Sequence, residues 1–132
     1  MKQNFYFFRR INWWLEQARI LLFRRKITSR ELGILEKEFR FFGKLDTQHR
    51  REFLKKMEII LSSKRFIGSG GIVDVTPEME ILISATISMV TLGWKRLRLA
   101  HFNTILIYPN VYYSSSQKIY HRGEVNPKKG QI

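Results

Sequence analysis

The 132-residue sequence lacks cysteine and long apolar runs, and each absence removes a class of protein. Without cysteine, neither a disulfide framework nor a thiolate zinc site can form. No segment has the roughly 20 consecutive apolar residues that a membrane-spanning helix needs. Arg9 and Arg10 interrupt the N-terminus, which therefore lacks the apolar core of a secretory signal. We therefore expect a protein of the cytoplasm.

Acidic residues are also scarce, with 11 Asp and Glu against 24 Lys and Arg, for a net charge of +13. The imbalance is concentrated in residues 1–65, where 17 basic residues face 7 acidic ones. Such a charge can attract nucleic acid, anionic lipid or an acidic protein. A hydrophobic content of 44% nevertheless predicts a folded chain, and the length suits one domain at most.

Residues 1–27 are predicted to be a variable, basic, amphipathic arm that precedes the domain of residues 28–132. Apolar side chains recur at helical spacing from Asn4 to Lys26, at Phe7, Ile11, Trp14 or Leu15, Ala18 and Leu22. Two interpretations stay open. The favoured one docks this helix on its own domain. The other attaches it to an anionic membrane surface through Arg9, Arg10, Arg19, Arg24 and Arg25, peripheral to the inner face of the membrane.

Two helices are predicted after the arm. Thr28 to Glu31 has the capping-box pattern, and the helix that it opens places Leu32, Leu35, Phe39 and Phe42 on one face before Gly43 ends it. Asp46 or Thr47 caps a second helix whose inward residues are Phe53, Leu54, Met57, Ile60 and Leu61. Its outward residues are Arg50, Arg51, Lys55 and Lys56.

The strongest helix signal starts at Thr76-Pro77-Glu78, which combines a side-chain cap, a preset φ and a carboxylate at the positive end of the dipole. Met79 to Leu92 is apolar or small nearly all round, which predicts a buried central helix that Gly93 stops. Thr104 to Tyr108 predicts a buried strand closed by Pro109. The glycines of residues 68–71 predict a plain turn. The fold class is therefore α+β.

The residues of catalysis are missing. The three histidines, His49, His101 and His121, have no metal-ligand spacing among them, and His121 with Glu124 would supply only two ligands. No serine lies in a Gly-x-Ser-x-Gly elbow. No site for a cofactor is predicted in this chain, and we expect no enzyme activity from these residues alone.

The order of motifs from Thr28 to the end resembles the front part of the MtfA-like zinc-dependent metallopeptidases, relatives of the gluzincin peptidases. The resemblance depends on Phe53-Leu54, Lys64 to Phe66, Val75-Thr76, Glu78-Met79, Leu82 to Ala85, Leu92-Gly93, Ile105 to Pro109 with Tyr112, Gly123 to Val125, and Gly130. Of these we take the following as family-motif residues with structural roles: Phe66, Thr76, Glu78, Met79, Gly93, Tyr108, Pro109, Gly123 and Glu124. The His-Glu-x-x-His helix that binds zinc in the family occurs nowhere in the sequence.

The resemblance implies the N-terminal, non-catalytic portion of a gluzincin-like domain. It implies zinc and aminopeptidase-like activity for a full-length relative, and a missing C-terminal catalytic segment as the first partner. A transcription repressor is a further partner by family analogy. The alternative function is a basic module that binds nucleic acid or an anionic membrane surface. Nucleic acid is disfavoured, because the basic residues spread over several helix faces and no RNA-stacking motif is present.

Overall fold

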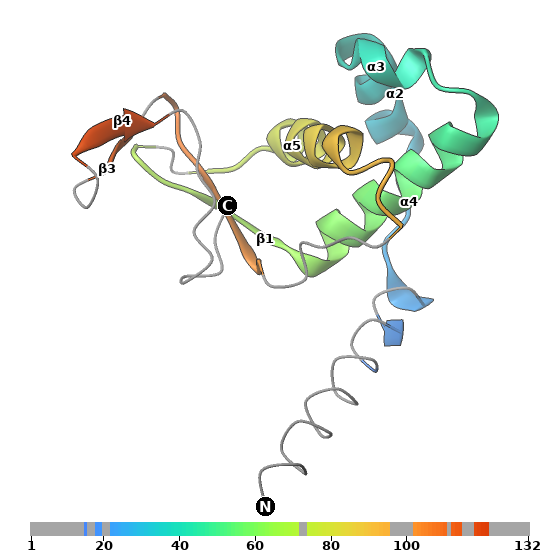
Figure 1. The fold of residues 1–132 in the computed structure, drawn as a ribbon, viewed down its shortest axis with the longest axis horizontal. Coiled ribbons are helices and arrows are strands. Elements are labelled where there is room, and N and C mark those ends of the chain that lie inside the picture. The colour runs from blue at the N-terminus through green and yellow to red at the C-terminus, as the bar shows by residue number, and fades with distance from the viewer. Residues whose placement is uncertain are drawn as a thin grey trace, which may run out of the picture.

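The computed structural model describes residues 15, 18–19, 22–71, 74–95, 102–110, 112–114 and 118–121. Its helices are α2 (Ser29–Glu38), α3 (Arg40–Gly43), α4 (Thr47–Ser63) and α5 (Pro77–Val90). Its strands are β1 (Arg65–Gly68), β2 (Thr104–Ile107), β3 (Tyr112–Ser114) and β4 (Ile119–His121). The predicted α+β class is confirmed. The β3–β4 hairpin lies at the opposite end of the molecule from α2 and α3 (Figure 1).

The three predicted helix starts are confirmed by their caps. Thr28 Oγ1 accepts from the Glu31 backbone N–H, and a Glu31 carboxylate oxygen accepts from the Thr28 N–H, which completes the capping box. Asp46 caps α4 by accepting from the His49 N–H at 2.9 Å. Thr76 caps α5 by accepting from the Met79 N–H at 3.3 Å. Each cap satisfies a backbone donor that has no partner within its helix.

The predicted helix that ends at Gly43 is divided, which corrects the expectation of one continuous face. Phe39 leaves helical geometry, at φ −116° and ψ 81°, and separates α2 from α3. The break brings three neighbouring rings onto Phe53 of α4, with centroid distances of 6.0, 6.1 and 5.5 Å to Phe39, Phe41 and Phe42. A straight helix would direct positions 39 and 41 to nearly opposite sides, so tertiary packing overrides the local pattern here.

Helix α5 is central, as predicted, and packs against both α4 and α2. Only part of it is buried, however: Ile81, Ser84, Ala85 and Ser88 are covered, whereas Thr86, Met89 and Val90 are exposed. The helix also ends at Val90 rather than Leu92, because Thr91 leaves helical geometry and its hydroxyl donates to the Ile87 carbonyl at 2.8 Å. The expectation of burial all round was therefore wrong for the C-terminal half of α5.

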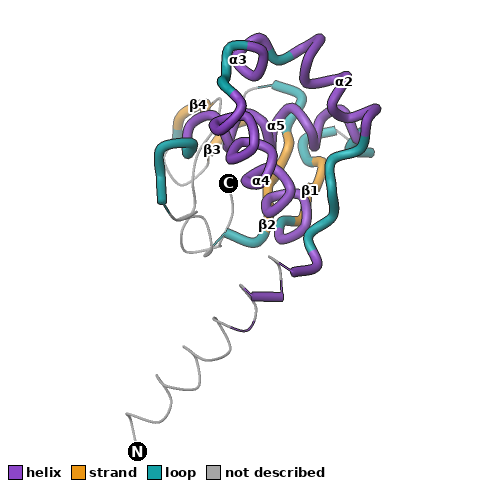
Figure 2. The backbone as a smooth tube through the Cα atoms, turned by 90° about the vertical axis from the view of Figure 1, so that its right-hand side faces the viewer, coloured by secondary structure: helices purple, strands orange, loops and turns teal. Residues whose placement is uncertain are grey.

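Strands β1 and β2 are parallel and are joined through α5, so the three elements form a βαβ unit. The register pairs Phe66 with Ile105 and Ile67 with Leu106. The buried strand predicted at Thr104 is confirmed over Thr104–Ile107, whereas β1 was not predicted at all. Both strands lie beside α4 and α5 (Figure 2).

The glycine turn after β1 is confirmed and depends on Gly70. Its φ of +62° is the left-handed conformation that side chains disfavour. A Cβ at Gly70 would also lie 2.9 Å from the Tyr108 ring and 3.4 Å from Pro109. The turn therefore lets the chain leave β1 directly against the end of β2.

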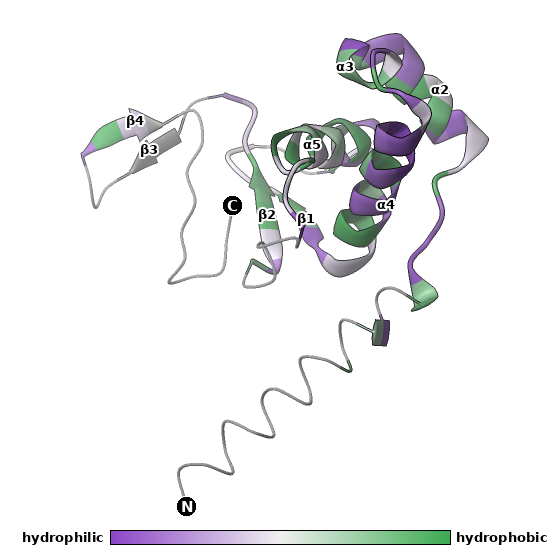
Figure 3. Ribbon diagram, turned by 45° about the vertical axis from the view of Figure 1, so that its right-hand side comes forward, coloured by the Kyte–Doolittle hydropathy of each residue, from purple (hydrophilic) through white to green (hydrophobic). Residues whose placement is uncertain are grey.

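The core lies between the helices. Its largest cluster of fully buried residues consists of Leu35, Phe42, Phe53, Met57, Ile81 and Ala85, which come from α2, α3, α4 and α5, and Ile60 of α4 is fully buried as well. In Figure 3, where green marks hydrophobic residues, the ribbon of α5 is largely green and that of α4 alternates between green and purple. Each large side chain that is buried in this way stabilises the fold by about 1.5–3 kcal/mol.

Candidate functional site

The seven family-motif residues that the structure describes are distributed over the βαβ unit and the turns around it, and they do not converge on one centre. Phe66 lies half-buried in β1, and Tyr108 and Pro109 follow β2 and lie against Gly70. Gly93 lies in an exposed turn beyond α5. These positions support packing between strands and turns and bring no reactive groups together.

Thr76, Glu78 and Met79 form the first turn of α5. Thr76 is the cap, and Met79 supplies the backbone N–H that the cap accepts. Glu78 accepts from Arg30 of α2 at 3.3 Å, in an ion pair exposed to solvent. The turn therefore joins α5 to α2, and surface pairs of this kind contribute at most about 1 kcal/mol.

Four predicted site residues lie outside the described residues: Gly123, Glu124, Arg9 and Arg10. Of the other arginines assigned to an anionic surface, Arg19 is exposed. Arg24 and Arg25 instead take part in ion pairs within the chain, at a junction between the arm and the domain. The proposed role of these arginines at a membrane stays a prediction.

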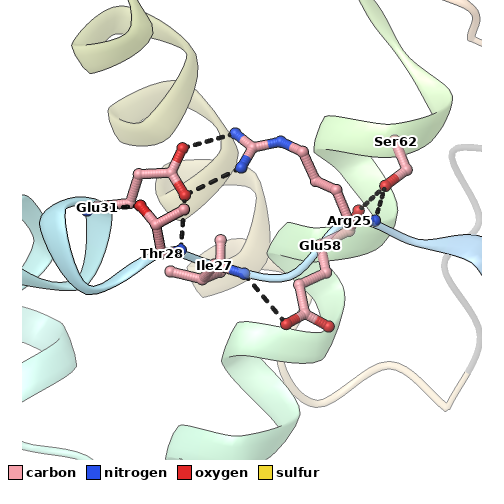
Figure 4. A network of polar contacts seen from close by, with 6 residues as sticks. All are labelled: Arg25, Ile27, Thr28, Glu31, Glu58 and Ser62. Carbon is pink, nitrogen blue, oxygen red and sulfur yellow. Dashed lines mark hydrogen bonds and ion pairs between the residues drawn. The ribbon is translucent and has the colours of Figure 1, made fainter.

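The junction is built around Glu58, a carboxylate on α4 that is only 8% exposed. Arg24 Nε donates to Glu58 Oε2 at 2.7 Å, and Lys26 Nζ lies 3.4 Å from the same oxygen. The Ile27 backbone N–H reaches the other oxygen at 3.4 Å (Figure 4). A buried carboxylate needs such donors, because an unpaired charge is costly inside a protein.

A second set of contacts joins the junction to α2. Arg25 donates through both terminal nitrogens to Glu31, at 2.8 and 2.9 Å. Donation from Arg25 lowers the pKa of the Glu31 carboxyl, and the hydrogen bond with Glu31 raises the pKa of Arg25. The Arg25 backbone N–H also donates to Ser62 Oγ at 3.0 Å (Figure 4). The Glu31 carboxylate thus takes part in the capping box of α2 and also binds Arg25 of the arm.

Sequence reasoning missed Glu58, although a signal was present. Glu58 falls four residues after Leu54 and three before Leu61, on the apolar face of α4. An acidic residue at that position, in a chain with few acidic residues, indicates a buried ion pair. Its partners could not be chosen from the sequence, because Arg24 and Lys26 resemble the other basic residues of the arm.

Lys56 was placed on the outward face of α4, and this was wrong. It is partly buried, and its Nζ donates to the carbonyls of Thr91 at 2.6 Å and Trp94 at 3.0 Å. These carbonyls lie at the C-terminal end of α5, which favours a cation. Burial lowers the pKa of Lys56. Lys56 therefore joins α4 to the end of α5.

A catalytic zinc ion does not fit the residues that the structure describes. Within those residues, no three His, Asp or Glu side chains are close enough to hold a metal ion. His49, the one histidine whose side chain is described, is exposed and hydrogen-bonded to Asp46, which raises the pKa of the imidazole. The donor set needed for a zinc peptidase, at least three such ligands, is therefore not assembled in this part of the chain.

None of the helices in the described part of the chain is long and apolar enough to cross a membrane. The sequence profile of the glucose-regulated metallo-peptidase M90 family matches residues 11–132. An uncharacterized protein of Synechocystis sp., slr2042, is 28% identical over 99 residues, which cover 75% of this chain. The matched region spans only 36% of that relative's length. No solved structure matches the chain.

Proposed function

Because this chain belongs to the glucose-regulated metallo-peptidase M90 family, we propose that its 132 residues are the N-terminal portion of a zinc-dependent peptidase and are inactive by themselves. The observation that carries the proposal is a family match over residues 11–132 in a sequence without a His-Glu-x-x-His helix. The chain would supply the scaffold, and the zinc ligands and general base would come from a further segment.

Exposed apolar surface in the βαβ unit supports a scaffold role. Met89 and Val90 at the end of α5 are exposed, and so are Trp94 in the following turn and Ile67 in β1. Among the described residues, β1 and β2 pair only with each other, so each has one edge without a strand. Exposed edges and apolar patches of this kind are where a further protein segment packs.

The proposal is tested by zinc content and peptidase activity of the 132-residue protein. After dialysis against zinc, inductively coupled plasma mass spectrometry is expected to find far less than one zinc ion per chain. Hydrolysis of aminoacyl p-nitroanilides is expected to be no faster than in buffer without protein. An intact zinc peptidase serves as the positive control. Zinc retained at one ion per chain, together with hydrolysis that a chelator abolishes, would contradict the proposal.

A protein partner is proposed by family analogy alone. A glucose-responsive transcription repressor is the candidate that the family suggests, and its binding would require a surface of this chain or of the catalytic segment. Pull-down of such a repressor by the 132-residue protein would assign the surface to this chain. Capture only by a longer chain would assign it to the catalytic segment.

A further inference from the structure

The described part of the arm carries an apolar face that nothing in the described structure covers. Leu15, Leu22 and Phe23 are helical and are 63%, 78% and 81% exposed. Positions seven and eight residues apart lie on one side of a helix, and the exposed Arg19 falls on the same side. We name these four residues, Leu15, Arg19, Leu22 and Phe23, the arm face.

The arm face begins where the junction ends. Arg24 and Arg25 are bound to carboxylates of α4 and α2, so the chain immediately after Phe23 is fixed to the domain. The short helical piece before residue 24 nevertheless stands apart from the packed helices (Figure 3). Its base is fixed while Leu15, Leu22 and Phe23 stay exposed, which presents the arm face outward.

The charge of the arm selects the kind of partner. Residues 1–27 contain seven basic residues and one acidic residue, Glu16. A second copy of this chain would bring the same positive charge, which opposes self-association through the arm. Nucleic acid would satisfy the charge but would leave exposed leucines without a role. An anionic membrane surface uses both features, because interfacial helices bury apolar side chains among headgroups and place arginines at phosphates.

We propose that the arm face binds the surface of an anionic phospholipid membrane, with Leu22 and Phe23 entering the headgroup layer and Arg19 at the lipid phosphates. Arg24 and Arg25 hold the arm in position, and they contact lipid less than Arg19 does. The proposal concerns only the arm face and would hold for an active or an inactive peptidase chain.

Vesicle co-sedimentation of the full chain tests the proposal. Vesicles of phosphatidylglycerol and phosphatidylcholine are compared with vesicles of phosphatidylcholine alone, at low and at moderate salt. Binding is expected to be about tenfold or more tighter with the anionic lipid and to weaken as salt increases. Equal binding to both kinds of vesicle, or binding to neither, would overturn the proposal.

Paired variants assign the binding to the arm face. L22E/F23E is expected to weaken binding to the anionic vesicles by about tenfold or more, since it replaces inserted apolar groups with carboxylates that carry the same negative charge as the lipid. The control I119E/Y120E changes two exposed residues of β4 and is expected to bind as the wild type does. Equal loss in both double variants would overturn the proposal, because it would show only general adhesion.

Net charge is controlled separately. R19E and R51E change the charge by the same amount at exposed sites, one on the arm face and one on α4. R19E is expected to weaken binding severalfold more than R51E. Equal effects would show that total charge alone drives binding, which would overturn the proposal.

Circular dichroism melts of all variants are expected to match the wild type, because each substituted side chain is exposed. Tight binding of a single-stranded oligonucleotide without vesicle binding would favour the nucleic-acid alternative.

Discussion

The helices and the strands of this chain differ in how much of their apolar surface they cover. Helices α2 to α5 bury seven apolar residues completely, among them Phe42, Phe53 and Met57. In the strands, Ile105 is covered, whereas Ile67 is 43% exposed and Ile119 is 53% exposed. The helices thus supply a core of their own, whereas the strands, together with the end of α5 at Met89 and Val90, leave apolar positions open. The difference supports a scaffold whose strand side receives a further segment of the peptidase.

The largest expected effect comes from breaking the helical core. Phe53→Ala removes the ring that contacts Phe39, Phe41 and Phe42, and it should lower the free energy of unfolding by about 3–5 kcal/mol. Ile67→Ala in β1 should cost about 1 kcal/mol or less, because the side chain is partly exposed. Urea denaturation measures both. Equal losses would mean that the strands are as well packed as the helices.

The junction should give the next largest effect. Glu58→Ala leaves the Arg24 guanidinium and the Ile27 N–H without their shared acceptor, and it should lower the free energy of unfolding by about 2 kcal/mol. Glu52→Ala removes an exposed carboxylate from the same helix as a control and should change stability by about 0.5 kcal/mol or less. Proteolysis of the arm should also accelerate in Glu58→Ala alone. An unchanged cleavage rate would contradict the role of the junction.

Alanine substitutions at two glycines compare a position where the backbone conformation requires glycine with one where it does not. Gly70→Ala should lower the free energy of unfolding by about 1–2 kcal/mol, since its φ is positive and a Cβ there would lie 2.9 Å from the Tyr108 ring. Gly33→Ala in α2 has open space and should raise stability by about 0.5–1 kcal/mol. Thermal melts measure both. A neutral Gly70→Ala would show that the turn after β1 is not fixed by β2.

The last prediction is a pH dependence of stability that arises at Lys64, where α4 ends and β1 begins. Burial lowers the pKa of Lys64, at the end of α4, to about 8. Its unfolded value is near 10.5, so between about pH 8 and 10.5 the unfolded chain binds more protons. This group should therefore make the protein more stable as pH rises through that window, and the penalty for burying its charge is fully present below it. Lys64→Met should flatten the rise in denaturation midpoints, whereas the exposed-lysine control Lys55→Met should retain it.

The sequence predicted features that depend on neighbouring residues. The caps at Thr28, Asp46 and Thr76 were found because each capping side chain and the backbone N–H that donates to it lie within three residues. The apolar run that starts at Thr104 identified β2, because this signal also lies in consecutive residues. The family assignment is confirmed as well, and the family match extends further toward the N-terminus than Thr28.

Features that depend on distant contacts could not be predicted. β1 has four residues, and it becomes a strand because Arg65 pairs with Thr104, 39 positions later. Phe39 ends α2 because of Phe53, which no local pattern indicates. Arg24 and Arg25 look like residues of a solvated basic face until Glu58 and Glu31 are placed beside them. No zinc ligands could be predicted for this chain, since the sequence contains no His-Glu-x-x-His motif.

The reading frame beyond codon 132 tests the central claim most directly. Sequencing of the gene and its transcript is expected to show an in-frame continuation that encodes an aliphatic strand and then a His-Glu-x-x-His helix. That result would make this chain the scaffold portion of a zinc peptidase. A stop codon directly after Ile132, in both gene and transcript, would contradict the claim, because a protein of this sequence alone has no zinc-binding helix.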